Sequence, residues 1–509
     1  MQRALDIDRS RFADWYQAVV RDADMAETSP VRGAMVIKPW GWGVWEQIQQ
    51  ELDRRIKASG HENCYFPMFI PLSFIAKEAE HVEGFAKEMA VVTHHRLKMI
   101  DGKLQPDPAA RLEEPLVVRP TSETIIGDAF SRWIKSYRDL PMLLNQWANV
   151  VRWEMRPRLF LRTTEFLWQE GHTAHATAEE AVAETMTALE MYRAFSEDVL
   201  AMPVIAGEKP ENERFPGAVA TYSIEAMMQD GKALQAGTSH FLGTHFAQAQ
   251  NIKFQDDAGT MTFCNTTSWG VSTRLIGGVI MTHGDDDGLR LPPAIAPRQI
   301  VVVPMLRDKP EDAEVLAYCE SLVAALSSLY VFGHPVRVLL DTKKIKSAEK
   351  RWNWVRRGAP IIIEIGPRDA AAGNITYMRR DSLRDGDKVK SIAAGRAEFL
   401  EEKAVQLLAE IQHALYAEAK ARLDANITSG VTDWKGVEDY YAGGDDEFKG
   451  WLKVAWSKPS GAELEAVDAR LKTLKLTIRN APLQQPGSMA ACLFTGRPGV
   501  EEILIGRAY

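Results

Sequence analysis

The sequence has little cysteine and no long apolar run, and each shortage excludes a class of protein. Its 509 residues contain four cysteines, and no Cys-x-x-Cys pair occurs, so neither a zinc knuckle nor a redox pair is predicted. So few thiols favour a reducing compartment. No run approaches the roughly 18 apolar residues of a transmembrane helix, and the first residues lack the apolar core of a secretion signal. The sequence therefore predicts a soluble, cytoplasmic protein without a membrane segment.

Charge and composition are not extreme either. The 61 basic and 69 acidic residues give a formal net charge of -8, which excludes a uniform basic coat for nucleic acid but allows a local basic face. Apolar residues are 46% and charged residues 26%, as in ordinary globular proteins. A chain of this length is expected to form about three domains.

One proline-rich segment divides the chain. Residues 291–297 contain three prolines and predict a stiff linker after a first domain at residues 1–290. Strand and helix patterns alternate over residues 298–400, which predicts a small α/β domain with a largely parallel sheet. Residues 401–509 predict a long helical linker, over 396–424, and a small α+β domain.

Two helices are expected in the first domain. Apolar residues at Trp45, Ile48, Leu52 and Ile56 have helical spacing and predict a helix over 42–59. A capping box at 177–180 opens a second helix. Its expected core stripe consists of Val182, Met186, Leu189, Tyr192, Phe195 and Val199.

Three polar clusters stand out from this scaffold. In the first, Thr121, Ser122 and Glu123 follow an apolar run, and the plain alternative to a ligand site is a capped helix. In the second, a strand over 145–154 and an extended run over 159–175 flank a basic loop.

The second cluster combines charge with aromatic rings. On strands, Arg152 and Glu154 would share one face, as would Arg162, Thr164, Phe166 and Trp168. Such a face suits phosphates and an aromatic base, because arginine binds phosphate bidentately and a ring stacks on a base. A surface hairpin with ion pairs is the alternative.

The third cluster joins residues 235–240 to Ser272, Thr273 and Arg274, which open an apolar helix. An arginine is poorly placed at a helix start, because the helix dipole is positive there, so Arg274 is predicted to serve a ligand. A capped core helix with a surface arginine is the alternative.

These motifs resemble a known family. Arg152-x-Glu154 with its strand-loop-strand, and the sequence Gly-x-Ser-Thr-Arg at 270–274, resemble motifs 2 and 3 of class II aminoacyl-tRNA synthetases. The helix at 42–59 resembles motif 1, the dimer element. Residues 121–123, 166–172 and 235–240 resemble prolyl-tRNA synthetases in particular, in the archaeal and eukaryotic-type form that lacks the bacterial editing insertion.

The resemblance implies fold and function together. The implied fold is an antiparallel-sheet catalytic core, an α/β anticodon-binding-like domain and a small α+β C-terminal domain, assembled as a homodimer. The implied reaction is ATP-dependent activation of L-proline to prolyl-adenylate, followed by transfer to tRNA(Pro). Mg²⁺ is expected with ATP near Glu154 and Gln235, and no zinc is expected, since Cys492 stands alone in the C-terminal segment.

The resemblance also implies roles for individual residues. Arg152 and Arg274 are the implied catalytic residues. Implied proline contacts are Thr121, Glu123, Arg152, Trp168 and His240. Implied ATP contacts are Arg152, Glu154, Arg162, Thr163, Phe166, Gln235, Thr238, Ser272 and Arg274.

The α/β segment departs from the family pattern. An acidic and a basic reader of the anticodon are expected where this sequence has Val355 and Ile362. Basic residues cluster nearby, interleaved with Trp352 and Trp354, and suit RNA phosphates and stacked bases. The predicted tRNA contacts are Lys343, Lys344, Lys346, Lys350 and Arg351; a solvated helix with inward tryptophans is the alternative. A paralogue that adenylates proline but has another acceptor, or a resistance or regulatory role, is the alternative function.

Overall fold

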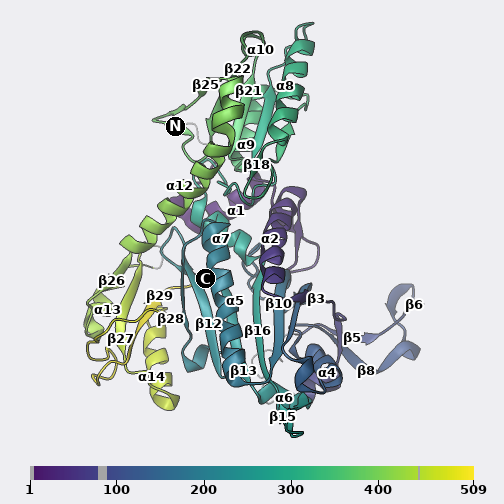
Figure 1. Ribbon diagram of the computed structural model, residues 1–509, viewed down its shortest axis with the longest axis vertical. Coiled ribbons are helices and arrows are strands. Elements are labelled where there is room, and N and C mark those ends of the chain that lie inside the picture. The colour runs from purple at the N-terminus through teal and green to yellow at the C-terminus, as the bar shows by residue number, and fades with distance from the viewer. Residues whose placement is uncertain (1–4, 78–88, 445–446) are drawn as a thin grey trace.

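A computed structural model describes residues 5–77, 89–444 and 447–509. Its centre is an 11-stranded sheet, antiparallel except for one parallel pair at each edge. In sheet order the strands are β26 (Ile427–Ser429), β27 (Trp451–Trp456), β29 (Glu501–Gly506), β28 (Thr477–Pro482), β11 (Val204–Glu208), β12 (Ala220–Met227), β13 (Ala233–Gly243), β16 (Asn265–Ser272), β10 (Glu165–His175), β9 (Met142–Val151) and β3 (Glu62–Asn63). The expected antiparallel-sheet core is confirmed (Figure 1).

Helices surround the sheet of the central unit, which we define as residues 5–283. They are α1 (Phe12–Asp22), α2 (Pro39–Ala58), α4 (Glu123–Trp133), α5 (Ala178–Asp198), α6 (His245–Gln250) and α7 (Arg274–His283). Of these, α5 makes the most extensive contact with the sheet. The helix expected over 42–59 is confirmed as α2, which starts slightly earlier because Pro39 fits its first turn. Its four predicted apolar positions are all buried.

The capping box that opens α5 is present. Thr177 Oγ1 accepts from the Glu180 N–H, and the Glu180 carboxylate accepts from the Thr177 N–H. The predicted core stripe was partly wrong, because Val182 is 38% exposed. Leu189, Tyr192 and Phe195 are buried as expected, together with the small residues Ala181, Thr185 and Ala188. These small residues let the helix pack closely on β13 and β16.

The predicted strand-loop-strand differs from the structure in its limits: the first strand was placed three residues too late, and the second was started six residues too early. The first, β9, ends at Val151, and the second, β10, begins at Glu165. Arg152 and Glu154 therefore lie in the connecting loop, so strand alternation does not place their side chains. The loop is tied back to itself by a hydrogen bond from Arg152 N–H to Thr164 O, at 2.8 Å.

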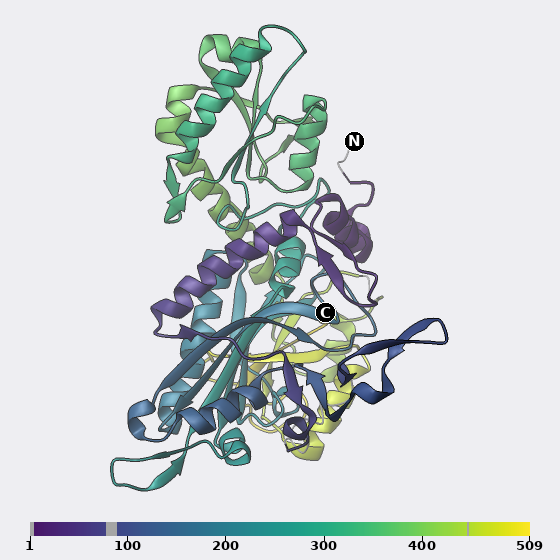
Figure 2. The ribbon, with the colours of Figure 1, turned by 90° about the vertical axis from the view of Figure 1, so that its right-hand side faces the viewer.

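Smaller elements surround the core. A three-stranded sheet contains β4 (Phe69–Pro71), β8 (Arg111–Val118) and β5 (Val91–His94), and α3 (Leu72–Lys77) follows β4. Two-stranded pairs are formed by β1 (Ala26–Thr28) with β2 (Met35–Ile37), by β6 (Leu97–Ile100) with β7 (Lys103–Pro106), and by β14 (Lys253–Gln255) with β15 (Met261–Phe263). The β6–β7 hairpin projects from the body of the molecule (Figures 1 and 2).

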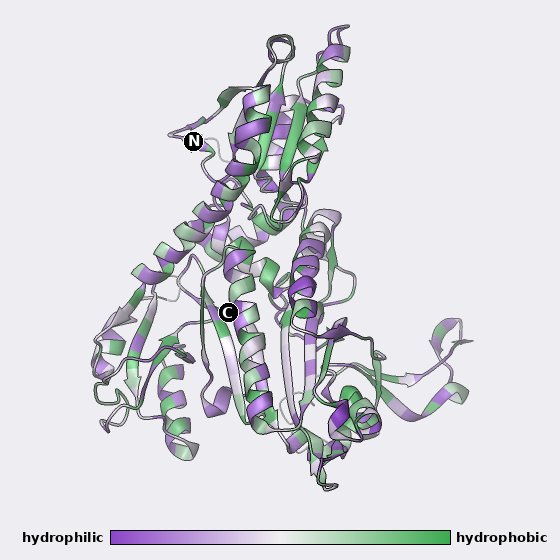
Figure 3. Cartoon of the chain, in the orientation of Figure 1, coloured by the Kyte–Doolittle hydropathy of each residue, from purple (hydrophilic) through white to green (hydrophobic). Residues whose placement is uncertain are grey.

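The α/β unit, residues 299–395, contains a five-stranded sheet. Its order is β20 (Val338–Leu340), β17 (Ile300–Pro304), β21 (Ile361–Ile365), β22 (Asn374–Arg379) and β25 (Ile392–Gly395). The expected parallel sheet holds for the first three strands, whereas β22 and β25 pair antiparallel. Its helices are α8 (Asp312–Ser327), α9 (Ser347–Arg356) and α10 (Pro367–Ala372). Apolar residues line its central strands (Figure 3).

A long helix joins this unit to the C-terminal unit, residues 426–509. The expected helix over 396–424 contains α11 (Arg396–Glu398), a π-helical turn (Phe399–Lys403) and α12 (Ala404–Ala425). The C-terminal unit adds α13 (Trp434–Tyr440) and α14 (Gly461–Lys472) to strands β26–β29. Because β28 pairs with β11, its sheet continues the sheet of the central unit. The division into residues 1–290, 298–400 and 401–509 stays a prediction, since one sheet runs through the first and third of these segments.

Three arginine–carboxylate pairs connect the loop that follows α7 to the α/β unit and to α12. Arg380 pairs with Asp285, Arg384 with Asp287 and Arg290 with Glu418. Across the three described segments, no helix is both long enough and apolar enough to cross a bilayer.

Candidate active site

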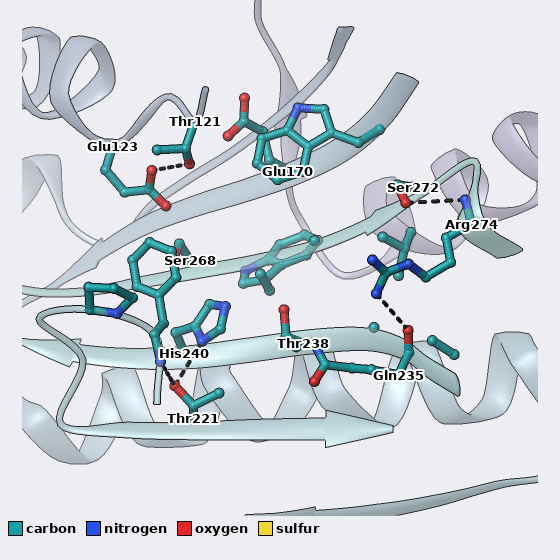
Figure 4. Close-up of a pocket in the computed structure, with 18 of the residues that line it drawn as sticks. Thr121, Glu123, Glu170, Thr221, Gln235, Thr238, His240, Ser268, Ser272 and Arg274 are labelled. Carbon is teal, nitrogen blue, oxygen red and sulfur yellow. Dashed lines mark hydrogen bonds between the residues drawn. The ribbon is translucent and has the colours of Figure 1, made fainter. Parts of the chain in front are cut away.

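A pocket of about 280 Å³ opens on the sheet between β10, β12, β13 and β16. Predicted residues from all three polar clusters line it: Thr121, Glu123, Arg152, Phe166, Trp168, Gln235, Thr238, His240, Ser272 and Arg274. Figure 4 labels seven of them, all except Arg152, Phe166 and Trp168. Glu123 and His240 lie near one end, whereas Gln235 and Arg274 lie near the other. The structure thus brings together ten residues that are far apart in the sequence.

Strand alternation explains much of this lining. Phe166, Trp168, Glu170 and His172 occupy every second position of β10 and all line the pocket. On β13 the register with β12 shifts at Ala236, and this bulge allows Gln235 to line the pocket with Thr238 and His240.

The entrance to α4 forms one end of the pocket. Ser122 is the N-cap residue, but its hydroxyl accepts no cap hydrogen bond from the N–H groups of α4 and instead donates to Glu170. The hydroxyl of Thr121 donates to the Glu123 carboxylate, and Glu123 is 8% exposed. A helix cap therefore does not account for this cluster, because its polar groups are turned toward the pocket and toward β10.

Glu170 and His172 form a buried pair in the pocket wall. Glu170 Oε2 lies 2.9 Å from His172 Nε2, and Glu170 Oε1 also accepts from Gln146 Nε2 at 2.8 Å. Burial by itself would raise the pKa of Glu170, but the hydrogen bond and charge of His172 lower it. Burial would lower the pKa of His172, but Glu170 raises it. The pair therefore favours an ionised carboxylate and an imidazolium.

His240, unlike His172, is neutral. Its Nδ1 lies 3.0 Å from Thr221 Oγ1, and its ring packs on Phe215 with centroids 4.7 Å apart. Burial lowers its pKa to about 3, and the charge of His172 acts in the same direction. His240 is therefore neutral at neutral pH and can accept or donate one hydrogen bond to a ligand.

Arg152 connects the two ends of the pocket. Its Nε donates to Pro120 O at 2.9 Å, and its guanidinium lies 5.6 Å from the Phe166 ring centre and 5.5 Å from that of Trp168. Burial lowers its pKa, and the nearby carboxylates of Glu123 and Glu170 raise it. A cation in this position can meet an anion from either end.

Arg274 forms the other end, at the start of α7. Its N–H donates to Ser272 Oγ at 3.2 Å, and its guanidinium contacts the carbonyl oxygens of Leu161 and Gln235 at 3.3 and 3.5 Å. Burial, followed by the charges of Arg162 and Arg152, lowers its pKa to about 10. So many cations near one another suit a polyphosphate.

Three predicted ATP contacts lie outside the lining of the pocket. The Glu154 carboxylate accepts from the Arg156 N–H at 2.7 Å, in the loop after β9. The hydroxyl of Thr163 donates to Glu165 O at 2.7 Å. Arg162 is exposed, but its charge acts on Arg274, which places it on the same side as the arginine end of the pocket.

The predicted RNA contacts divide into two groups. The basic loop, which we define as Lys343, Lys344 and Lys346, is exposed just before α9. Lys350 is only 2% exposed and donates to Asp341 O at 2.8 Å, so the prediction that its ammonium contacts RNA was wrong in this structure. Arg351 pairs with Glu364 at 3.1 Å.

The tryptophans of α9 agree in part with the alternative interpretation, a solvated helix whose tryptophans face inward. Trp354 is buried, donates to Asp341 Oδ2 at 2.8 Å and packs on Trp40 of the central unit with ring centres 5.5 Å apart. Val355 and Ile362 are buried in the same core. These two positions therefore face the protein interior and are not available to an anticodon base.

Sequence reasoning missed several pocket residues. Glu170 and His172 could have been found, because they continue the every-second-residue pattern of Phe166 and Trp168. Phe215 lies in a loop before β12, and its approach to His240 has no signal in the local sequence. Within the described residues, no group of three or more His, Cys, Asp or Glu side chains could hold a metal ion.

Comparison with known proteins agrees with this architecture. Residues 105–283 match the family "tRNA synthetase class II core domain (G, H, P, S and T)", and residues 299–402 match "Anticodon binding domain". The proline--tRNA ligase of Sphingomonas elodea is 63% identical, with both chains covered completely. That of Sphingopyxis alaskensis is 62% identical over 100% of this chain and 96% of that protein.

Solved structures of prolyl-tRNA synthetases are also similar to this chain. The prolyl-tRNA synthetase of Cryptosporidium parvum, in complex with L-proline and AMP, superposes with a TM-score of 0.87 at 33% identity, over 99% of this chain and 97% of that one. A second structure of that protein, with halofuginone and AMPPNP, also gives 0.87, at 34% identity. Its close relatives, its matched domains and its pocket together show that the chain belongs to the prolyl-tRNA synthetases, a family of class II aminoacyl-tRNA synthetases.

Proposed function

We propose that this chain activates L-proline with ATP and transfers the prolyl group to tRNA(Pro). One observation carries the proposal. A single pocket has a carboxylate, Glu123, toward one end, an arginine, Arg274, toward the other, and Arg152 in electrostatic contact with both. This order of charges matches the ammonium, carboxylate and phosphates of the two substrates.

Activation joins two anions. An oxygen of the proline carboxylate attacks the α-phosphorus of ATP, the bond from that phosphorus to the bridging oxygen breaks, and pyrophosphate leaves. Arg152 would neutralise both groups as they approach. The cations at Arg274 and Arg162 would hold the phosphate tail, and the Phe166 ring and the guanidinium plane of Arg274 would cover the adenine. Positioning and charge stabilisation supply the rate, since no residue need form a covalent bond.

Recognition of proline would take place at the Glu123 end. The secondary ammonium of proline pairs with the Glu123 carboxylate, which Thr121 orients through its hydrogen bond. His240 is neutral and its ring stacks on Phe215, so this side of the pocket offers an uncharged wall to the pyrrolidine ring. Trp168, beside Arg152, is a further candidate wall.

The other ATP contacts follow from their place in the pocket. Gln235, Thr238 and Ser272 line it and can hydrogen-bond the nucleotide. Glu154 and Thr163 lie in the loop after β9, outside the lining, and we propose them as further ATP contacts from that side.

The residues present fit Mg²⁺ that is carried mainly by ATP. Glu154 offers one carboxylate and Gln235 one amide oxygen, which suits an ion that keeps most of its water and phosphate ligands. When bound there, Mg²⁺ would neutralise charge on the outer phosphates.

We also propose that the chain is a homodimer. One face of the β6–β7 hairpin is apolar and exposed: Leu97, Met99 and Leu104 are 58%, 60% and 62% exposed, and Met99 lies opposite Leu104 in the hairpin. We call these three residues the hairpin face. Tyr65 and Phe69, which follow α2, are 70% and 42% exposed. Such large exposed apolar side chains are typical of a protein interface.

In the second step of the proposed reaction, the prolyl group is transferred from the adenylate to tRNA(Pro). The terminal ribose hydroxyl of tRNA(Pro) attacks the adenylate carbonyl, and AMP leaves. The exposed basic loop before α9 is a candidate contact with the RNA backbone. The paralogue alternative is favoured by one observation, the burial of Val355 and Ile362 where readers of the anticodon were expected.

Two assays separate these functions. Proline-dependent ATP–pyrophosphate exchange tests the first step, and aminoacylation of purified tRNA(Pro) tests the second. The proposal expects both activities. Exchange without aminoacylation would favour the paralogue, and exchange that is absent with proline but present with another amino acid would reject proline as the substrate.

A further inference from the structure

A buried lysine lies just outside the pocket, at the end of β11. Lys209 is 2% exposed, and its Nζ donates to the carbonyl oxygen of Arg479 at 2.8 Å. The same Nζ lies 3.1 Å from Glu213 Oε2 and 3.6 Å from Glu225 Oε1. A buried ammonium costs several kcal/mol unless it is paired and hydrogen-bonded, so these contacts must be maintained together.

The partners of Lys209 belong to three different parts of the molecule. Glu213 lies in the loop that runs from β11 to β12, Glu225 lies on β12, and Arg479 lies on β28 of the C-terminal unit. Arg479 is also buried, and its Nε and Nη2 donate to Glu225 Oε2 at 3.1 and 2.8 Å. One carboxylate is thus shared by two cations, of which one comes from the C-terminal unit.

Glu225 remains ionised in this arrangement. It is completely buried, and burial would raise its pKa, but the charges of Arg479 and Lys209 and the hydrogen bonds from Arg479 and Ser223 lower it. Ser223 Oγ donates to Glu225 Oε1 at 2.9 Å. The cluster of Lys209, Glu213, Glu225 and Arg479 therefore keeps its charges at neutral pH. We call this cluster the joint.

The loop that begins at this joint ends in the pocket. Glu213, Arg214, Phe215 and Pro216 all line the pocket. The Phe215 N–H donates to Thr221 Oγ1 at 2.9 Å, and the same hydroxyl lies 3.0 Å from His240 Nδ1. The place of Phe215 on the His240 ring therefore depends on where the loop is anchored.

We propose that Lys209 is a positioning residue for the proline end of the pocket, and that the C-terminal unit supports proline binding through Arg479 without touching the substrate. This inference rests on the proposed function, because it takes that end of the pocket as the proline site. Lys209 acts at a distance: it fixes the start of the loop, and the loop presents Phe215 to His240. The arginine end of the pocket is formed by β13, β16 and α7 and not by this loop. Glu225 lies opposite Gln235 at that end, but Arg479 keeps it paired without Lys209, so we expect ATP binding to change much less than proline binding.

A second lysine at the same junction provides a matched control. Lys458 of the C-terminal unit pairs with Glu208 at 3.1 Å and with Glu501 at 3.4 Å, and its side chain is 42% exposed. It crosses between the same two units but does not contact Glu213 or Glu225 within the described residues. Exposed ion pairs of this kind contribute little to stability.

The test is steady-state ATP–pyrophosphate exchange of the full chain, with proline and ATP varied separately. Lys209→Met keeps the length of the side chain and leaves Glu225 paired with Arg479. We expect its KM for proline to rise about 10- to 100-fold, the range that a misplacement of about 1 Å can cause, with the KM for ATP within about twofold. Lys209→Arg should restore most of the proline affinity, and Lys458→Met should leave both KM values unchanged.

Three outcomes would overturn the inference. They are an unchanged KM for proline in Lys209→Met, an equal rise for both substrates, and the same effect in Lys458→Met. If Lys209→Met does not fold, Glu213→Gln removes only the loop side of the joint and should raise the KM for proline several-fold; no rise there would also reject it. Wild-type chain without proline-dependent exchange would instead reject the proposed function, so the two failures are distinguishable.

Discussion

Replacing Glu170 by glutamine should destabilise the protein in a way that depends on pH. The variant keeps the shape of the side chain but removes the negative charge that His172 faces at 2.9 Å. Both residues are buried, so the loss is that of a broken buried pair, about 3–5 kcal/mol where both partners are charged. The hydrogen bonds from Ser122 and Gln146 would also lose their ionic acceptor.

The sign of the pH dependence follows from the two pKa shifts. The pKa of His172 is raised above 6.5 in the folded state, so its contribution is complete below pH 6.5 and is lost as the pH rises through the raised value. The pKa of Glu170 is lowered below 4.5, so its contribution is present above pH 4.5 and is lost as the pH falls through the lowered value. The difference in the free energy of unfolding between the wild type and Glu170→Gln should therefore be largest between about pH 4.5 and 6.5.

Thermal unfolding of wild type and Glu170→Gln, each at pH 6 and pH 9, measures this difference. We expect the melting temperature of the variant to be lowered more at pH 6 than at pH 9. The variant Glu165→Gln, at an exposed position of the same strand, serves as a control and should show no such dependence. An equal loss at both pH values would refute the ionic pair, and the contact would then be a neutral hydrogen bond.

Three further predictions concern the substrates and the assembly. Glu123→Gln should raise the KM for proline much more than that for ATP in the exchange assay, since a charge-assisted hydrogen bond of roughly 1.5–3 kcal/mol is lost; equal losses would make Glu123 a structural residue. Alanine at all three lysines of the basic loop should lower the log–log salt slope of tRNA binding by roughly 2–3 units and leave exchange without tRNA unchanged; an unaltered slope would remove the loop from the RNA interface. Serine at all three positions of the hairpin face should shift the chain toward monomer in sedimentation velocity, and a dimer of undiminished stability would show that this face lies outside the interface.

The sequence was sufficient for those parts of the site that repeat a local pattern. The spacing of Trp45, Ile48, Leu52 and Ile56 predicted α2, because a buried helical stripe leaves a period in the sequence. The polar residues at 121–123 and 272–274 were correctly placed at helix starts, where side chains are directed by the first turn. The end of β10 at His175 was predicted correctly, whereas both limits of β9 and the start of β10 were wrong, since no local pattern in the loop marks where strand pairing stops.

Contacts between distant segments could not be predicted. The burial of Trp354 depends on Trp40, more than 300 residues earlier in the chain. The burial of Lys209 likewise depends on a distant segment, since its ammonium donates to the carbonyl of Arg479 on β28. Charge alone does not report burial, because a partner from elsewhere in the fold can compensate it.

Exchange by Arg152→Ala, at saturating proline and ATP, tests the central claim most directly. Arg152 interacts electrostatically with Glu123 at one end of the pocket and with Arg274 at the other. If it neutralises the carboxylate and the α-phosphate as they meet, its removal should lower the exchange rate about 10²-fold or more, as for other donors to a developing charge. A variant that is folded, binds both substrates and exchanges at a nearly normal rate would contradict the mechanism.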